Sequence, residues 1–210
     1  NKRMGVIFWR FLVSAIFWSG FEQAGSSLNL FARDLTDRMI FGWEVPASWL
    51  QSVNPIFIII GAPIFGSLWV ALERRNSDPS IPMKAGLGLV GLCAGFLVIA
   101  WGAANDSVDN VVSPAWLVVT YFLHTTGELC ISPIGLSAIT KLSPEKRVGQ
   151  MMGIWFVGAA LGNLFAGLVA GQLETMIPAD LFRTVAMITG GAGIVAIGLA
   201  PQVKKLTKGA

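Results

Sequence analysis

The stretch that decides the fold is Gly127-Glu128-Leu129-Cys130-Ile131-Ser132-Pro133. It lies inside an apolar segment from about Ala115 to Ile139, so Glu128 is 13 residues from Ala115 and 13 from Lys141. At about 1.5 Å per helical residue, Glu128 is roughly 20 Å from either end, near the middle of a bilayer about 30 Å thick. A carboxylate at that depth indicates a proton, ion or substrate site, or a structural hydrogen bond to a neighbouring helix.

The composition indicates a polytopic membrane protein. Of the 210 residues, 54% are hydrophobic and only 13% are charged, and the mean hydropathy is +0.66. These are too few charges to cover a water-soluble domain of this size. The net charge of +3 is spread over short loops, which predicts no nucleic-acid partner. The two cysteines lie in apolar segments and the chain has one histidine, so we expect no disulfide framework, no metal site and no haem.

Six apolar runs each reach the roughly 20 residues that a helix needs to cross the hydrocarbon. We therefore predict an all-α membrane protein with six transmembrane helices and no inserted soluble domain. The predicted spans are about residues 6–31, 47–72, 82–103, 115–139, 148–172 and 178–200. Six spans put both termini on one side. Twelve Lys and Arg residues fall on that side and three on the other, so the positive-inside bias predicts that both termini are cytoplasmic.

Glu22 is the second acid deep inside a predicted span. It is 12 residues from Arg10 and 11 from Arg33, which is roughly 17 to 18 Å along a helix from each. Neither Glu22 nor Glu128 has a basic residue of this chain at its depth, so the compensating charge must come from a proton, a substrate or protein outside this sequence. The chain begins with Asn1 rather than Met, and six helices are half of a common twelve-helix transporter plan. We interpret it as one half of such a carrier.

Other polar and aromatic residues are compatible with a solute pathway. Asn54, which precedes Pro55 near the external end of the second span, could line a cavity or simply join two helices. Trp155 and Phe156 are about 12 Å from the cytoplasmic end of the fifth span, deeper than an interfacial belt, so they could form a gate or pack against helices or lipid. His124 is one helical turn before the central glutamate. It could relay protons, although an imidazole that packs between helices is favoured.

Several motifs in a fixed order carry a resemblance to a known family. The motifs are Phe21–Ser27, Gln51–Pro55, Gly127–Ser137, Thr140–Pro144 and Met151–Phe156. Over nearly its whole length, the chain resembles the C-terminal six-helix half of the proton-dependent oligopeptide transporters, the POT family of the major facilitator superfamily. The six spans would be helices 7 to 12 of the family plan. The connection over about residues 104–114 is short, which resembles the bacterial form.

The resemblance implies roles for individual residues. Glu128 matches the glutamate that meets the amino terminus of a bound peptide, and Asn54 matches the asparagine that joins it there. Ser132 matches a serine of the pocket. Trp155 matches a tryptophan near the pocket and the inner gate, where Phe156 is its neighbour.

Glu22 matches the glutamate that pairs with an arginine of the first helix in the external gate and that is implicated in proton coupling. In the family, this arginine and the other basic residues of the site lie on the N-terminal half, which is absent from this sequence. The resemblance therefore accounts for two deep carboxylates that have no cation of their own.

We expect the chain to contribute to proton-coupled symport of di- and tripeptides by alternating access in a bacterial cytoplasmic membrane. The coupling ion would be the proton, no cofactor is expected, and the partners would be peptides, lipid and the N-terminal six-helix half. The alternatives are a major facilitator carrier for another small solute and a non-transporting receptor or assembly subunit. An enzyme is not expected, because Ser137, in a run that resembles the rhomboid serine motif, is about 20 Å along the helix from His124, the only histidine.

Overall fold

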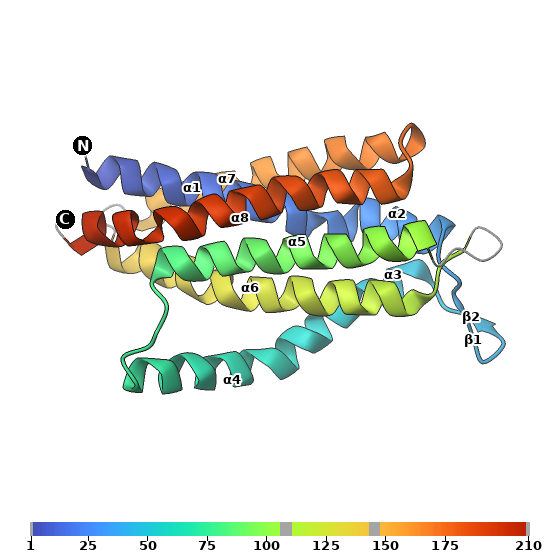
Figure 1. The fold of residues 1–210 in the computed structure, drawn as a ribbon, viewed down its shortest axis with the longest axis horizontal. Helices are drawn as coiled ribbons and strands as arrows, with labels where there is room; N and C mark the ends of the chain where they lie inside the picture. The colour runs from blue at the N-terminus through green and yellow to red at the C-terminus, as the bar shows by residue number, and fades with distance from the viewer. Residues whose placement is uncertain (1, 106–110, 143–147, 209–210) are drawn as a thin grey trace.

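The structure is a computed structural model that describes residues 2–105, 111–142 and 148–208. Several long helices run side by side along one axis (Figure 1). They are α1 (Lys2–Phe21), α5 (Ile81–Asn105), α6 (Pro114–Leu142), α7 (Val148–Ala170) and α8 (Pro178–Lys208). The beginning of α1 and the end of α8 lie at the same end of the bundle. A short 3-10 turn, η3 (Gly171–Glu174), connects α7 toward α8.

The first predicted span is not one continuous helix. After α1 the chain forms a 3-10 turn, η1 (Glu22–Gly25), and then a second helix, α2 (Ser27–Asp34). At Ser26 the backbone leaves the helical region with φ −121° and ψ −98°, and its hydroxyl donates to the carbonyl of Glu22 at 3.1 Å. Local bonds of this kind compete with the helical ladder. The predicted span over residues 6–31 is therefore divided, and the break falls at the deep carboxylate.

The connection to the second span contains a small hairpin that the sequence analysis did not anticipate. Strand β1 (Met39–Ile40) pairs with β2 (Trp43–Glu44), and the turn places Phe41 and Gly42 at φ 51° and 80°. The helix that follows is divided at Ser52 into α3 (Ala47–Gln51) and α4 (Val53–Arg74). The division agrees with the position of Pro55, which has no N–H to donate to the carbonyl of Gln51.

The core of the bundle lies around α5. Phe96 and Ile99 of α5 pack with Phe31 of α2, Tyr121 of α6 and Phe182 of α8 in one buried cluster. Helices α5 and α6 approach each other closely, since a Cβ added at Gly88 would be 2.9 Å from the carbonyl oxygen of Gly127. Small residues allow such close contact of membrane helices. The glycine that precedes Glu128 in the sequence thus fixes α6 against α5.

Helix α4 lies at the edge of the bundle, where it packs against α6 and is separated from α1, α7 and α8 (Figure 1). None of its residues, all of which the structure describes, is buried. Four segments in the described part of the chain are long and apolar enough to cross a membrane. They are Ala47–Arg74, Ile81–Asn105, Val148–Glu174 and Pro178–Leu206. The count of six spans and their orientation stay predictions.

Candidate functional site

Glu128 lies on α6, one residue after the close contact with α5, and its side chain is half-buried. Its Oε2 is buried and has no hydrogen-bond partner among the residues that the structure describes. A carboxylate oxygen in that situation carries a desolvation cost that a partner would relieve. The local geometry therefore leaves Oε2 of Glu128 as an acceptor without a donor.

Asn54 is brought to Glu128 from α4. Its position in the first turn, directly after the break at Ser52, aims the amide at α6, where Nδ2 donates to Oγ1 of Thr125 at 2.8 Å. The Thr125 hydroxyl in turn donates to the carbonyl of Tyr121 at 2.7 Å. The Asn54 side chain also interacts with the Glu128 carboxylate. The structure thus brings together the two residues that were predicted to act as a pair.

Thr125 was not singled out by the sequence analysis, although it belongs to the same cluster. It is 1% exposed and holds the Asn54 amide in place. Its spacing of three residues before Glu128 was the available signal, because residues three apart lie on the same side of a helix. Its partner is 71 positions away in the chain, so the contact itself was not visible in the sequence.

Glu22 begins the η1 turn, and its side chain is half-buried. Its carboxylate interacts with the side chain of Asn163 on α7, and it is close enough to Glu128 for their negative charges to repel. The next residue, Gln23, is 1% exposed and donates to the carbonyls of Ser19 at 3.1 Å and Ala166 of α7 at 3.5 Å. Gln23 also accepts a hydrogen bond from the Ser27 hydroxyl. The turn that carries Glu22 is therefore anchored to α1, α2 and α7.

The two carboxylates have no counter-ion within the described part of the chain. The ion pairs formed there join Arg33 to Asp34, Arg38 to Glu44, Lys84 to Asp78 and Arg183 to Asp180. This agrees with the sequence argument that the compensating charge comes from elsewhere.

His124 does not share the surroundings of Glu128. Its ring packs against Phe96 of α5 with centroids 4.6 Å apart, and a Cβ added at Gly95 would collide with the imidazole. The residue is 1% exposed. This position favours the packing interpretation over a proton relay.

Three predicted site residues are only partly placed. Ser132 and Trp155 lie on the backbones of α6 and α7, but their side chains fall outside the described part of the structure. Phe156, beside Trp155 on α7, is exposed. Their roles in a pocket and an inner gate stay predictions.

Two arginines near the hairpin form ion pairs. Arg33 and Asp34 form a two-fold contact at 2.6 and 2.8 Å, and the guanidinium lowers the pKa of the Asp34 carboxyl. Arg38 pairs with Glu44 at 2.5 Å. The reason is the hairpin, which places Glu44 across from the strand that follows Arg38.

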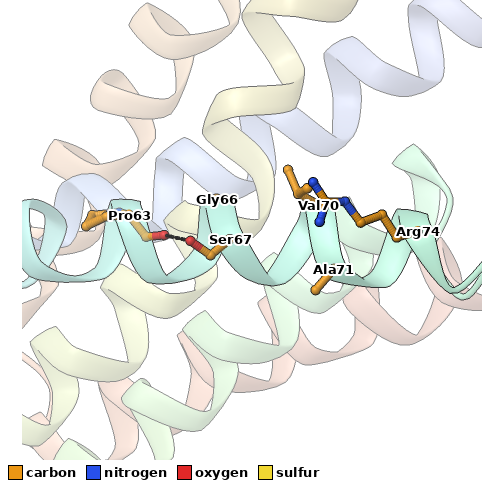
Figure 2. A pocket seen from close by; sticks show the side chains of 6 residues that line it. All are labelled: Pro63, Gly66, Ser67, Val70, Ala71 and Arg74. Atoms are coloured by element: carbon orange, nitrogen blue, oxygen red, sulfur yellow. Dashed lines mark hydrogen bonds between the residues drawn. The ribbon is translucent and has the colours of Figure 1, made fainter.

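An open hollow of about 590 Å³ lies along one face of α4 (Figure 2). It is lined by Pro63, Gly66, Ser67, Val70, Ala71 and Arg74. The lining side chains are small except for Arg74, and the one hydroxyl among them, on Ser67, donates to the carbonyl of Pro63 at 2.8 Å. This face of α4 therefore carries mostly small side chains, and its one hydroxyl already has a hydrogen-bond partner.

Comparison with known proteins extends these observations. A family model described as PTR2, POT family, matches residues 1–183. A peptide transporter of Yersinia enterocolitica, YePEPT, is 46% identical over 176 residues, covering 83% of this chain and 34% of that protein. Dipeptide and tripeptide permease A of Escherichia coli K12 is 30% identical over 219 residues, covering 99% and 43%. A crystal structure of a peptide transporter POT in complex with sulfate superposes with a TM-score of 0.87 at 34% identity, covering 97% of this chain and 41% of that one.

The long apolar helices and these matches indicate an integral membrane protein, and the matched relatives are transporters rather than enzymes. The chain belongs to the POT family. It spans between about a third and somewhat less than half of the length of the relatives that it matches.

Proposed function

We propose that this chain forms the C-terminal half of a carrier that couples the uptake of di- and tripeptides to protons. In this proposal the half has six transmembrane helices, and both termini lie on the cytoplasmic side of a bacterial inner membrane. The observation that carries the proposal is the half-buried Glu128, whose Oε2 lacks a donor in the described structure, beside Asn54.

The chemistry of this pair suits an ammonium group. An ammonium supplies both a positive charge and an N–H donor for the unpartnered Oε2 of Glu128. Because Asn54 donates through Nδ2 to Thr125, its Oδ1 remains able to accept from the same ammonium. A peptide with a free amino terminus would satisfy both residues at once, which supports peptides over anionic solutes.

Glu22 supplies the group for proton coupling. Its negative charge repels that of Glu128, so a proton on either residue, or a cation between them, removes an electrostatic cost. Glu22 lies in the η1 turn, and hydrogen bonds of the next residue join this turn to α1, α2 and α7. A change in the charge of Glu22 can therefore act on all three helices. An arginine on the N-terminal half would be its partner when the external side closes.

The hollow along α4 supports the presence of a second half. Small residues such as Gly66, Ser67 and Ala71 allow another helix to approach closely. Within the described structure, helix α4 packs against α6 through Asn54, Phe57 and Gly61, and its Trp69 ring meets Lys84 of α5. A helix of the N-terminal half would cover its open face.

Reconstitution of the full-length protein in liposomes tests the proposal. With acid outside, a labelled dipeptide should accumulate above its external concentration, and a protonophore should abolish the gradient. Glu22→Gln should keep peptide counterflow but lose the proton-driven accumulation. Binding without any accumulation by the parent protein would identify a receptor, and accumulation of a solute other than peptides would identify a different carrier.

A further inference from the structure

The packing of α7 against the first span brackets one polar residue, Asn163. On the cytoplasmic side of it, a Cβ added at Gly162 would be 2.7 Å from Cβ of Trp18 and 2.8 Å from the backbone nitrogen of Ser19. On the other side, the carbonyl of Ala166 accepts the hydrogen bond from Gln23. Helix α7 is therefore held against the chain directly before and directly after Glu22, with Asn163 between the two contacts.

Asn163 is unusual within its helix. The sequence of α7 contains no ionisable residue, and Gln150 in the first turn is its only other side-chain amide. Asn163 Nδ2 donates to the carbonyl of Ala159 at 3.3 Å, and its side chain interacts with the Glu22 carboxylate. An amide in a membrane helix carries a desolvation cost unless it has such partners.

The chemistry of an amide allows it to follow the charge of a carboxyl group. Its N–H groups can donate to an ionised carboxylate, and its carbonyl oxygen can accept from the O–H of a neutral carboxyl. A change of protonation at Glu22 therefore favours a different orientation of the Asn163 amide. Because α7 is pressed against α1 at Gly162, this exchange acts directly on the contact between the two helices.

We infer that Asn163 is a positioning residue that holds the Glu22 carboxylate at the η1 break and transmits its change of protonation to α7. The inference rests on the proposed function and deepens it. Trp155 and Phe156 lie on the same helix, eight and seven residues before Asn163, which is about 12 Å or less along the axis. The link thus connects the proposed external proton site to the proposed inner gate through one helix.

Few other charges act on this contact within the described structure. On the elements packed against η1, Arg33 and Asp34 of α2 pair with each other, and α7 has no charge. Arg10 of α1 is 12 residues away, roughly 18 Å along the helix; Lys2 and Arg3 are farther still along α1. From α6, Glu128 adds its negative charge. The Asn163 amide is the neutral partner on the remaining side.

The test compares Asn163→Leu, which keeps the approximate size and removes the amide, with Gln150→Leu as a matched control on the same helix. In the full-length protein, Asn163→Leu should retain dipeptide counterflow within about twofold. It should move the midpoint of the pH dependence of uptake upward by at least about half a pH unit, because a donor to the ionised carboxylate is lost. Gln150→Leu should leave the midpoint unchanged, and Asn163→Gln should restore part of the shift.

A second readout does not depend on transport. The infrared C=O stretch of the protonated Glu22 carboxyl, identified by its loss in Glu22→Gln, should titrate with a shifted midpoint in Asn163→Leu. In the Glu22→Gln background, Asn163→Leu should have no further effect on the pH profile. An unshifted infrared titration, or an equal effect of Asn163→Leu with and without Glu22, would overturn the inference. If the parent protein accumulates no peptide, the proposed function is contradicted. The infrared titration then decides the inference about Asn163 by itself.

Discussion

Helices α4 and α5 are equally apolar, yet they differ in how far they are buried in the bundle. Helix α5 buries residues along its whole length and forms the centre of the core, whereas none of the residues of α4 is buried. Their glycines show the difference. A Cβ at Gly88 or Gly91 of α5 would meet the backbone of α6, but a Cβ at Gly66 of α4 would meet nothing within 4 Å. Apolar composition shows which segments leave water, but only the contacts show whether they face protein within this chain.

The largest effect in this comparison is expected from filling the contact between α5 and α6. Gly88→Val should destabilise the folded chain by about 3 kcal/mol, because the added atoms meet the carbonyl of Gly127 and the backbone cannot yield easily. Unfolding of the purified protein by denaturing detergent measures this change. The matched variant Gly66→Val on α4 should change stability by less than about 0.5 kcal/mol. Equal effects at the two glycines would remove the distinction between the helices.

The end of α4 that leads into α5 is held by a single charged group of α5. Lys84 is 7% exposed, its Nζ lies 2.7 Å from Asp78, and it lies 4.2 Å from the centre of the Trp69 ring. Asp78→Asn leaves a buried ammonium with only the ring as a partner, so it should cost about 2 kcal/mol in the same unfolding measurement. Lys84→Met should cost less, because the half-exposed Asp78 can be solvated. The reverse order would show that the ammonium does not hold α4.

The open face of α4 should matter only when the N-terminal half is present. Gly66→Leu should leave the stability of this half unchanged but reduce its co-purification with a separately expressed N-terminal half by several fold, because a close helix contact is blocked. Ile59→Ala, which shortens an exposed side chain of α4 outside the hollow, serves as the control. Undiminished co-purification of Gly66→Leu would indicate that this face meets lipid.

The smallest effect is expected from the exposed Arg33–Asp34 pair. Since the pKa of Asp34 is lowered in the folded protein, its contribution is present at neutral pH and is lost as the pH falls through the lowered pKa. An exposed pair is screened by salt, so Asp34→Asn should be indistinguishable from the parent at pH 7 and moderate ionic strength. A measurable, salt-independent loss of stability would show that the pair is not simply a solvated contact.

The sequence was informative where the signal is local. Apolar length predicted the helical segments, and the motifs predicted that Asn54 and Glu128 belong together. The sequence could not reveal contacts between distant segments. The bonds of Asn54 to Thr125 and of Gln23 to Ala166 join residues 71 and 143 positions apart. The break at η1 was not visible in the sequence because Glu22, Gln23 and Ala24 are all residues that favour a helix. The pairing of Arg38 with Glu44 depends on a hairpin of two-residue strands.

The measurement that tests the central claim most directly compares two ligands on two proteins. Glu128→Gln keeps the shape of the side chain and removes its charge. Binding of a dipeptide with a free amino terminus, measured by titration calorimetry on the full-length protein, should weaken by about 2 to 5 kcal/mol, the range for breaking one side of a buried charge pair. An N-acetylated dipeptide should bind the parent weakly and lose much less, because it has no ammonium to contribute. Equal losses for the two ligands, or unchanged binding of the free-amino dipeptide by Glu128→Gln, would contradict the assignment of Glu128 as the receptor of the amino terminus.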